Sequence, residues 1–68
     1  MPYELNRFRA EYLVLAEYLD MPALRLKREQ VQRLCGLERT VCQRVLDALV
    51  EERFLCVTAD GAYARFTE

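Results

Sequence analysis

Apolar residues recur with a helical period along the first third of the chain. Between Glu4 and Leu19, six apolar side chains fall within about a third of the helical circle at about 100° per residue. These positions are Leu5, Phe8, Tyr12, Leu15, Ala16 and Leu19. The pattern predicts an amphipathic helix that packs this stripe against the core. The helix is expected to end before Pro22, which has no N–H and restricts the residue that precedes it.

The next segments are shorter. Residues 23–26 have the spacing of a brief extended piece. Residues 28–35 return to a helical pattern, with Val31, Leu34 and Cys35 on one side. Gly36 follows this segment, and a glycine in that place commonly ends a helix.

The segment 38–52 predicts a third helix with two distinct faces. At about 100° per residue, an apolar face and a polar face lie opposite each other. The apolar face comprises Val41, Cys42, Val45, Leu46 and Leu49. The polar face comprises Arg39, Thr40, Gln43, Arg44 and Asp47.

The last part of the chain predicts a β-hairpin, because Asp60-Gly61 favours a two-residue type I′ turn between two runs of strand-forming residues. That turn places Ala59 opposite Ala62. One face then holds the pairs Val57 with Ala64 and Leu55 with Phe66, and the other holds Thr58 with Tyr63 and Cys56 with Arg65. We expect the first face to be core and the second to be mostly wet.

Composition limits the class of protein. The chain has 68 residues, of which 53% are apolar and 31% are charged. These values predict a single globular domain over residues 1–68 and argue against disorder. No apolar run approaches the ~20 residues of a membrane helix. The start of the chain lacks the features of a signal peptide, so we expect a cytoplasmic protein with reduced cysteines and no membrane partner.

Residue usage also bears on chemistry. Serine and histidine are absent, which removes serine–histidine and cysteine–histidine catalysis. The three cysteines contain no CxxC pair, and adjacent Glu51 and Glu52 diverge around a helix. We therefore expect no enzyme, no metal and no cofactor. Cys35 and Cys42 are expected in the core. Cys56 is expected on the wetter face of the hairpin, where it could either sense oxidants or simply pack against its neighbours.

The order of these segments resembles the winged helix-turn-helix family. Residues 28–46 are similar to its helix-turn-helix core, with Gly36 in the turn and with Val31, Cys42 and Val45 as packing positions. Residues 46–55 resemble the passage into the first wing strand, and residues 60–65 resemble the wing turn and its return strand. The resemblance implies an α+β, mainly helical fold of three helices with a C-terminal β-hairpin wing. Gln32 departs from the pattern, because the family often has a small residue there.

The resemblance also implies a function. Helix 38–52 would lie in the major groove of double-stranded DNA, with hairpin 54–67 as the wing, in a small transcriptional regulator. The residues expected to contact bases or phosphates are Arg39, Thr40, Gln43 and Arg44. Those expected to position the domain on the DNA backbone are Lys27, Arg28 and Arg65. Residues 25–44 carry six basic and two acidic side chains, the charge expected for phosphate contacts. The net charge of -1 and the pI of about 5.4 predict modest non-specific affinity.

Partners complete the prediction. Ala10, Leu13 and Val14 lie off the expected core stripe of the first helix and would be exposed in a monomer. We interpret them as the seam of a homodimer, although scattered surface apolar residues would give the same pattern. A homodimer would supply the affinity that one protomer lacks. The alternative function is a winged helix that binds a partner protein and does not bind DNA.

Overall fold

The computed structural model describes residues 2–66, with side chains described from Arg9 onward. Its elements are α1 (Pro2–Asp20), β1 (Arg25–Leu26), α2 (Arg28–Cys35), α3 (Arg39–Glu51), β2 (Leu55–Val57) and β3 (Tyr63–Arg65). The described part of the chain is therefore a small, mainly helical α+β fold with a three-stranded antiparallel sheet. The predicted helices are confirmed to within a few residues at their ends, and the brief extended piece is β1.

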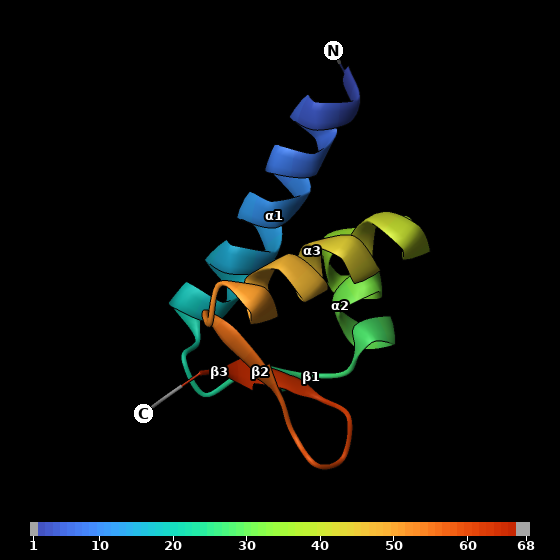
Figure 1. Cartoon of the computed structure of the whole chain (residues 1–68). Coiled ribbons are helices and arrows are strands. Elements are labelled where there is room, and N and C mark those ends of the chain that lie inside the picture. Colours follow the sequence, from blue (N-terminus) through green and yellow to red (C-terminus); the bar gives the residue numbers. More distant parts are fainter. Residues whose placement is uncertain (1, 67–68) are drawn as a thin grey trace.

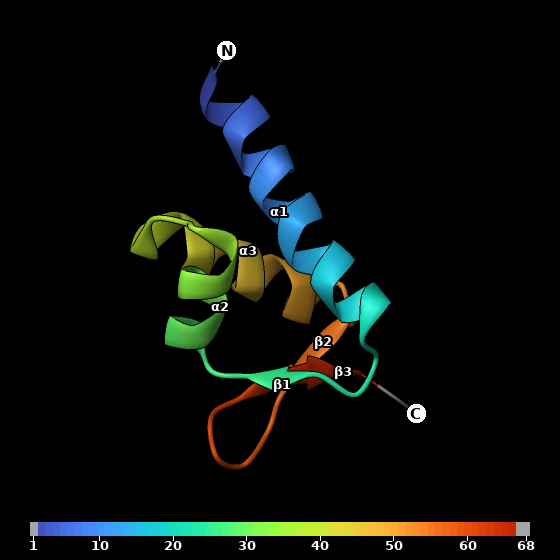
Figure 2. The ribbon, with the colours of Figure 1, turned by 180° about the vertical axis from the view of Figure 1, so that it is seen from behind.

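The sheet lies at one end of the helices, below α3 and the C-terminal end of α1 (Figure 1). The first turns of α1 project beyond the other helices, away from the sheet. Figure 2 shows the same arrangement from behind, with β1 running from the end of α1 across the sheet into α2. The short strand therefore connects two helices that pack on the same central helix, α3.

Local sequence sets the ends of α2 and α3. Gly36 ends α2 with φ +65°, in the left-handed region that glycine tolerates without a Cβ clash. At the start of α2, the backbone N–H of Lys27 donates to Oε1 of Gln30 at 2.8 Å. At the start of α3, the carboxylate of Glu38 accepts from the Val41 N–H at 3.3 Å. An anionic cap suits the positive end of the helix dipole.

The core forms where α1, α2 and α3 meet the sheet. Its buried side chains are Ala10, Val14, Tyr18, Val31, Cys42, Val45, Leu46, Leu49 and Leu55. The prediction for α3 is confirmed at four of five apolar positions, with Val41 only partly buried. On α2, Val31 is buried as predicted. Leu34 was expected beside it but is 53% exposed, because it lies about 60° around α2 from Val31, next to Leu26 at the surface.

The predicted inward face of α1 is wrong at Tyr12 and Leu19, although Leu15 packs partly buried against the core as expected. Ala10 is 2% exposed and Val14 is fully buried, so neither can belong to an external dimer seam, whereas Leu13 is 37% exposed, as predicted. Tyr12 and Leu19, expected in the core, are 68% and 54% exposed. Leu5 and Phe8 lie outside the side chains that the structure describes.

The physical reason lies in size and polarity. Both sides of α1 are apolar, so the helical period alone did not distinguish them. Ala10 and Val14 are small and allow α1 to approach its neighbours closely. Tyr18 is fully buried, and its hydroxyl donates to the backbone carbonyl of Tyr63 at 2.7 Å. A buried hydroxyl needs such a partner, and the observed rotation of α1 provides one.

The strands pair in the order β1-β3-β2. In the hairpin, Leu55 pairs with Arg65, Cys56 with Ala64 and Val57 with Tyr63. The predicted register is therefore wrong by one residue, and so is the predicted two-residue turn. The loop has three residues, 59–61. The Thr58 N–H donates to the Ala62 carbonyl at 2.7 Å, and the Gly61 N–H donates to the Thr58 carbonyl at 2.9 Å.

The loop length follows from backbone geometry. A type I′ turn needs positive φ at both central residues, but within the described residues only Gly36, Arg53 and Gly61 have it. Gly61, at φ +87°, occupies the left-handed position that follows a tight turn in three-residue hairpin loops. Asp60 therefore keeps negative φ, and the strands shift by one position. This shift moves Arg65 to the same face as buried Leu55.

The Tyr18 hydrogen bond generates a stability prediction. Removal of the hydroxyl in Tyr18→Phe leaves the Tyr63 carbonyl without this donor, so we expect the free energy of unfolding at neutral pH to fall by about 1 kcal/mol. Urea denaturation measures the loss. Tyr12→Phe is the matched control, since Tyr12 is exposed and its hydroxyl loss should leave the midpoint unchanged.

The same pair of variants has a pH signature. Burial raises the pKa of Tyr18 from 10.0 to about 12. Between these values the unfolded chain has lost a proton that the folded protein retains, so Tyr18 lowers the free energy of unfolding as pH rises, by up to about 1.4 kcal/mol per pH unit. The deficit of Tyr18→Phe should therefore shrink above about pH 10. Parallel pH profiles for the wild type and Tyr18→Phe would contradict this assignment.

Candidate nucleic-acid interface

The predicted polar face of α3 is the exposed face of that helix. Arg39, Thr40 and Arg44 are exposed, and Gln43 is half-buried. The helix continues on this side to the exposed acidic residues Asp47 and Glu51. The face is thus basic over its N-terminal half and acidic over its C-terminal half. An anionic ligand would be attracted to the first half and repelled by the second.

Gln43 forms hydrogen bonds with two neighbouring side chains that were not predicted from the sequence. Its Nε2 donates to Oδ1 of Asp47 at 2.9 Å and to the hydroxyl of Tyr63 at 3.3 Å. The amide has two N–H donors, so both contacts can form together. The Asp47 contact is the usual neighbour of a helical i, i+4 pair and could have been anticipated. The Tyr63 contact depends on where β3 lies against α3.

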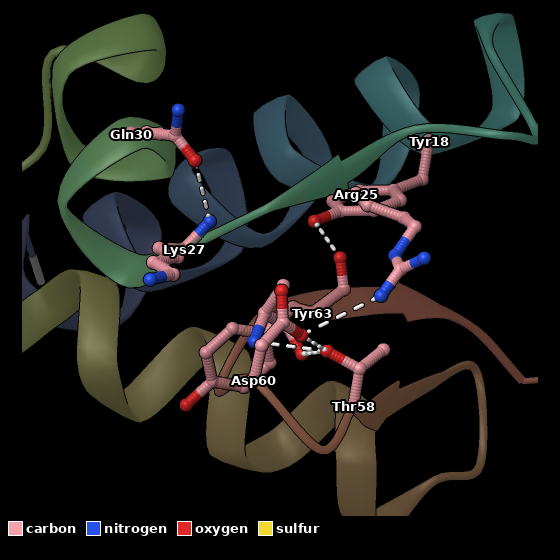
Figure 3. Close-up of polar contacts among 8 residues, drawn as sticks. Tyr18, Arg25, Lys27, Gln30, Thr58, Asp60 and Tyr63 are labelled. Carbon is pink, nitrogen blue, oxygen red and sulfur yellow. Dashed lines mark hydrogen bonds and ion pairs between the residues drawn. The ribbon is translucent and has the colours of Figure 1, made fainter.

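Tyr63 connects three elements around this face. Its backbone carbonyl accepts from Tyr18 on α1, and its hydroxyl accepts from Gln43 on α3. Figure 3 shows Tyr18 reaching down to Tyr63, with the hairpin loop beside it. The strand thereby sets the position of the Gln43 side chain relative to the sheet. The amide of Gln43 would have to leave one of its partners to present both N–H groups to an external ligand.

The two basic residues expected to position a nucleic-acid backbone differ in availability. Lys27 is exposed at the N-terminus of α2 (Figure 3). Arg28 is half-buried, donates from Nη1 to Oε1 of Gln32 at 3.0 Å, and lies 3.6 Å from Oε2 of Glu29. Gln32, the departure from the family pattern, therefore turns along the surface of α2 toward Arg28. Of these two residues, Lys27 is the more exposed, and no ion pair of its side chain is found within the described part of the chain.

Arg65 does not lie on the wet side of the hairpin, so that expectation is wrong. Its guanidinium carbon lies 4.3 Å from the centroid of the Phe54 ring, and the side chain is half-buried. Its Nε is buried and lacks a hydrogen-bond partner within the described residues. The one-residue register shift is the cause, because it turns Arg65 toward the side of Leu55 and Phe54. The stacking holds this cation against the hairpin.

The hairpin loop is bound to β1. Arg25 Nη2 lies 3.4 Å from Oδ1 of Asp60, and Asp60 also accepts from the hydroxyl of Thr58 (Figure 3). The Thr58 hydrogen bond, with a smaller effect of the Arg25 charge, lowers the pKa of Asp60. The carboxylate at the loop tip therefore stays ionised at neutral pH. It partly neutralises Arg25, one of the six basic residues of segment 25–44.

The three cysteines differ in their surroundings. Burial raises the pKa values of the Cys35 and Cys42 thiols, which keeps them protonated and unreactive. Cys56 is half-buried beside the backbone of Arg65, 3.9 Å from its carbonyl oxygen. No group of three or more His, Cys, Asp or Glu within the described residues could hold a metal ion. Among the described helices, none has the length and apolar character needed to cross a membrane.

Comparisons with known proteins give no relative. No protein-family model, no curated protein and no solved structure matches this chain.

The contact between Gln43 and Tyr63 can be measured by a double-mutant cycle. Gln43→Ala and Tyr63→Phe each remove one side of the hydrogen bond, and we expect a coupling free energy of about 0.5–1 kcal/mol between them. Urea denaturation of the two single variants and the double variant gives this value. A cycle of Thr40→Ala with Tyr63→Phe is the control and should be additive. Additivity of the Gln43 cycle as well would show that the contact contributes nothing.

Proposed function

We propose that this chain is a winged helix-turn-helix domain that binds double-stranded DNA as a small transcriptional regulator. In this proposal α3 lies in the major groove and the β2–β3 hairpin is the wing. Support for the fold comes from the order α1-β1-α2-α3-β2-β3 and from a sheet in which the N-terminal strand pairs with the last strand. That order is the one the resemblance implies for the family.

The observation that carries the function is the exposed, basic N-terminal half of α3. Arg39, Thr40 and Arg44 lie on the side of the helix opposite its buried apolar residues. Arginines can bind guanine edges or phosphates, and a threonine can contact a phosphate or a thymine methyl group. A helix that packs on the core by one side and presents such residues on the other has the form of a groove-reading helix.

The contact set is smaller than the sequence suggested. We assign Arg39, Thr40 and Arg44 to direct contact and Lys27 to the DNA backbone. Gln43 joins them only when its amide leaves Asp47 or Tyr63. Arg65 is left out because it stacks on Phe54, and Arg28 is partly compensated by Glu29. The wing would then approach DNA with an ionised Asp60 at its tip, so it contributes little attraction.

Few phosphate contacts imply a moderate dependence on salt. With about two to four phosphates contacted per protomer, the slope of log affinity against log salt should be about -2 to -4 per protomer. The acidic C-terminal half of α3 and the net charge of -1 oppose non-specific binding. Sequence-specific contacts, or a second protomer, would then be needed for a stable complex.

Selection from random DNA tests the proposal. Purified protein is incubated with a pool of random duplexes at two salt concentrations, and the retained DNA is sequenced. We expect an enriched motif whose retention falls at the higher salt concentration. No retention at the lower salt concentration would overturn DNA binding. The alternative, a winged helix that binds a partner protein, would then take its place, as the acidic flanks and the exposed apolar side of α1 would favour.

Alanine substitutions test the assigned face. Arg44→Ala should weaken binding to the selected sequence by about 1–3 kcal/mol if Arg44 contacts a base, and Arg39→Ala should weaken it similarly. Arg53→Ala is the matched control, because it removes the same charge from an exposed position after α3. Fluorescence anisotropy on the selected duplex gives the dissociation constants. If all three variants lose the same binding free energy, the loss comes from the change in net charge alone. That result would contradict a role of this face of α3 in base recognition.

A further inference from the structure

The outward side of α1 is an apolar surface that the chain itself leaves uncovered. We call the four side chains Tyr12, Leu15, Ala16 and Leu19 the outer stripe. Tyr12 and Leu19 are 68% and 54% exposed, and Leu15 and Ala16 are half-buried. The stripe lies opposite the buried side formed by Ala10, Val14 and Tyr18, at about 180° around the helix.

A helix that is apolar on both sides normally has partners on both sides. The domain fully covers the Ala10 side of α1 and covers the other side only in part, at Leu15, which packs against the edge of the core. On that other side, Tyr12 and Leu15 border an open groove that Leu49 and Glu52 also line, at the C-terminal end of α3. Leu49 is buried at the floor of this groove, and the carboxylates of Glu11 and Glu52 lie at its rim, so the exposed apolar surface is that of the outer stripe itself. A domain of this size also buries a limited core, so additional apolar burial would stabilise it.

We propose that a second copy of this chain covers the outer stripe, with the two α1 helices packed antiparallel across a two-fold axis. Charge determines both the partner and the direction. Arg9 and Asp20 lie on one edge of the stripe, at about 60° and 80° from Tyr12 and near opposite ends of its length. Both are exposed, and neither forms an ion pair or a hydrogen bond within residues 9–66.

An antiparallel pair brings Arg9 of one protomer to Asp20 of the other, and the two-fold axis repeats the contact. The axis then passes between positions 14 and 15, within the span of the outer stripe. In a parallel pair the two-fold axis would run along the helices and put the two Arg9 side chains, and likewise the two Asp20 side chains, on opposite edges of the interface, so neither charge would gain an opposite partner. The helix is thus complementary to itself in charge and in apolar surface, as an isologous interface requires.

The proposed interface leaves the candidate nucleic-acid interface open. Its groove lies against the C-terminal end of α3, through Leu49 and Glu52, whereas Arg39, Thr40 and Arg44 occupy the N-terminal half of that helix. Dimerisation through the outer stripe does not depend on the proposed DNA binding. Its test therefore uses the protein alone.

Sedimentation equilibrium of the full chain over a range of concentrations tests the dimer. We expect a reversible monomer–dimer equilibrium. Tyr12→Glu and Leu19→Glu should each raise the dimer dissociation constant by at least about 30-fold, because each buries a charge in an apolar interface. Leu34→Glu is the matched control, since Leu34 is equally exposed but lies on α2, and it should leave the constant unchanged. Circular dichroism checks that each variant is folded.

Charge reversal tests the direction without altering apolar surface. Arg9→Glu and Asp20→Arg should each raise the dissociation constant by about 3- to 10-fold, and the double variant should restore it to within about 3-fold of the wild type. A monomer at every concentration would overturn the proposal, as would a dimer that Tyr12→Glu and Leu19→Glu leave intact. Failure of the double variant to recover would overturn the antiparallel arrangement.

Discussion

The hydrogen bond from the Tyr18 hydroxyl to the Tyr63 carbonyl is the contact on which the arrangement of this small domain depends. Tyr18 is the largest fully buried side chain, and its hydroxyl needs an acceptor inside the core. The position of this acceptor selects the side of α1 that packs inward. The same hydrogen bond attaches the last strand to the first helix. The two partners are 45 positions apart in the sequence, so this contact closes the fold.

Tyr63 carries this constraint to the surface. The same residue whose carbonyl accepts from α1 also accepts, through its hydroxyl, from Gln43 on α3. The outer face of α3 is consequently divided. Arg39, Thr40 and Arg44 stand out from the domain, while Gln43 is engaged with the sheet and with Asp47. A polar residue on an exposed face can thus be engaged within the domain, and the function that we propose rests on the exposure and the basic character of the N-terminal half of α3.

Packing also redistributes the basic charge of segment 25–44. Arg25 lies close to Asp60 on the hairpin loop, and Arg28 turns to Gln32 and Glu29. The positive charge that remains directed outward is concentrated at Lys27, Arg33 and the start of α3. At the other end of the domain, the apolar outer stripe of α1 borders the acidic end of α3. The molecule thus presents a cationic region and an apolar region that do not overlap, and each suits a different class of partner.

The sequence was enough to predict the helices, because each has local signals: periodic apolar positions, Gly36 at the end of α2, and a buried face on α3 that follows from the helical period. It also determined which side of α3 is polar, since that helix has only one apolar face. The tertiary structure alone decided three other features. α1 has two apolar faces, so its inward side depended on a distant carbonyl that could accept from Tyr18. The hairpin register depended on Asp60 keeping negative φ, and one residue of shift moved Arg65 from solvent onto Phe54. The engagement of Gln43 depended on the position of β3, because a hydrogen bond between separate elements leaves no periodic trace in the chain.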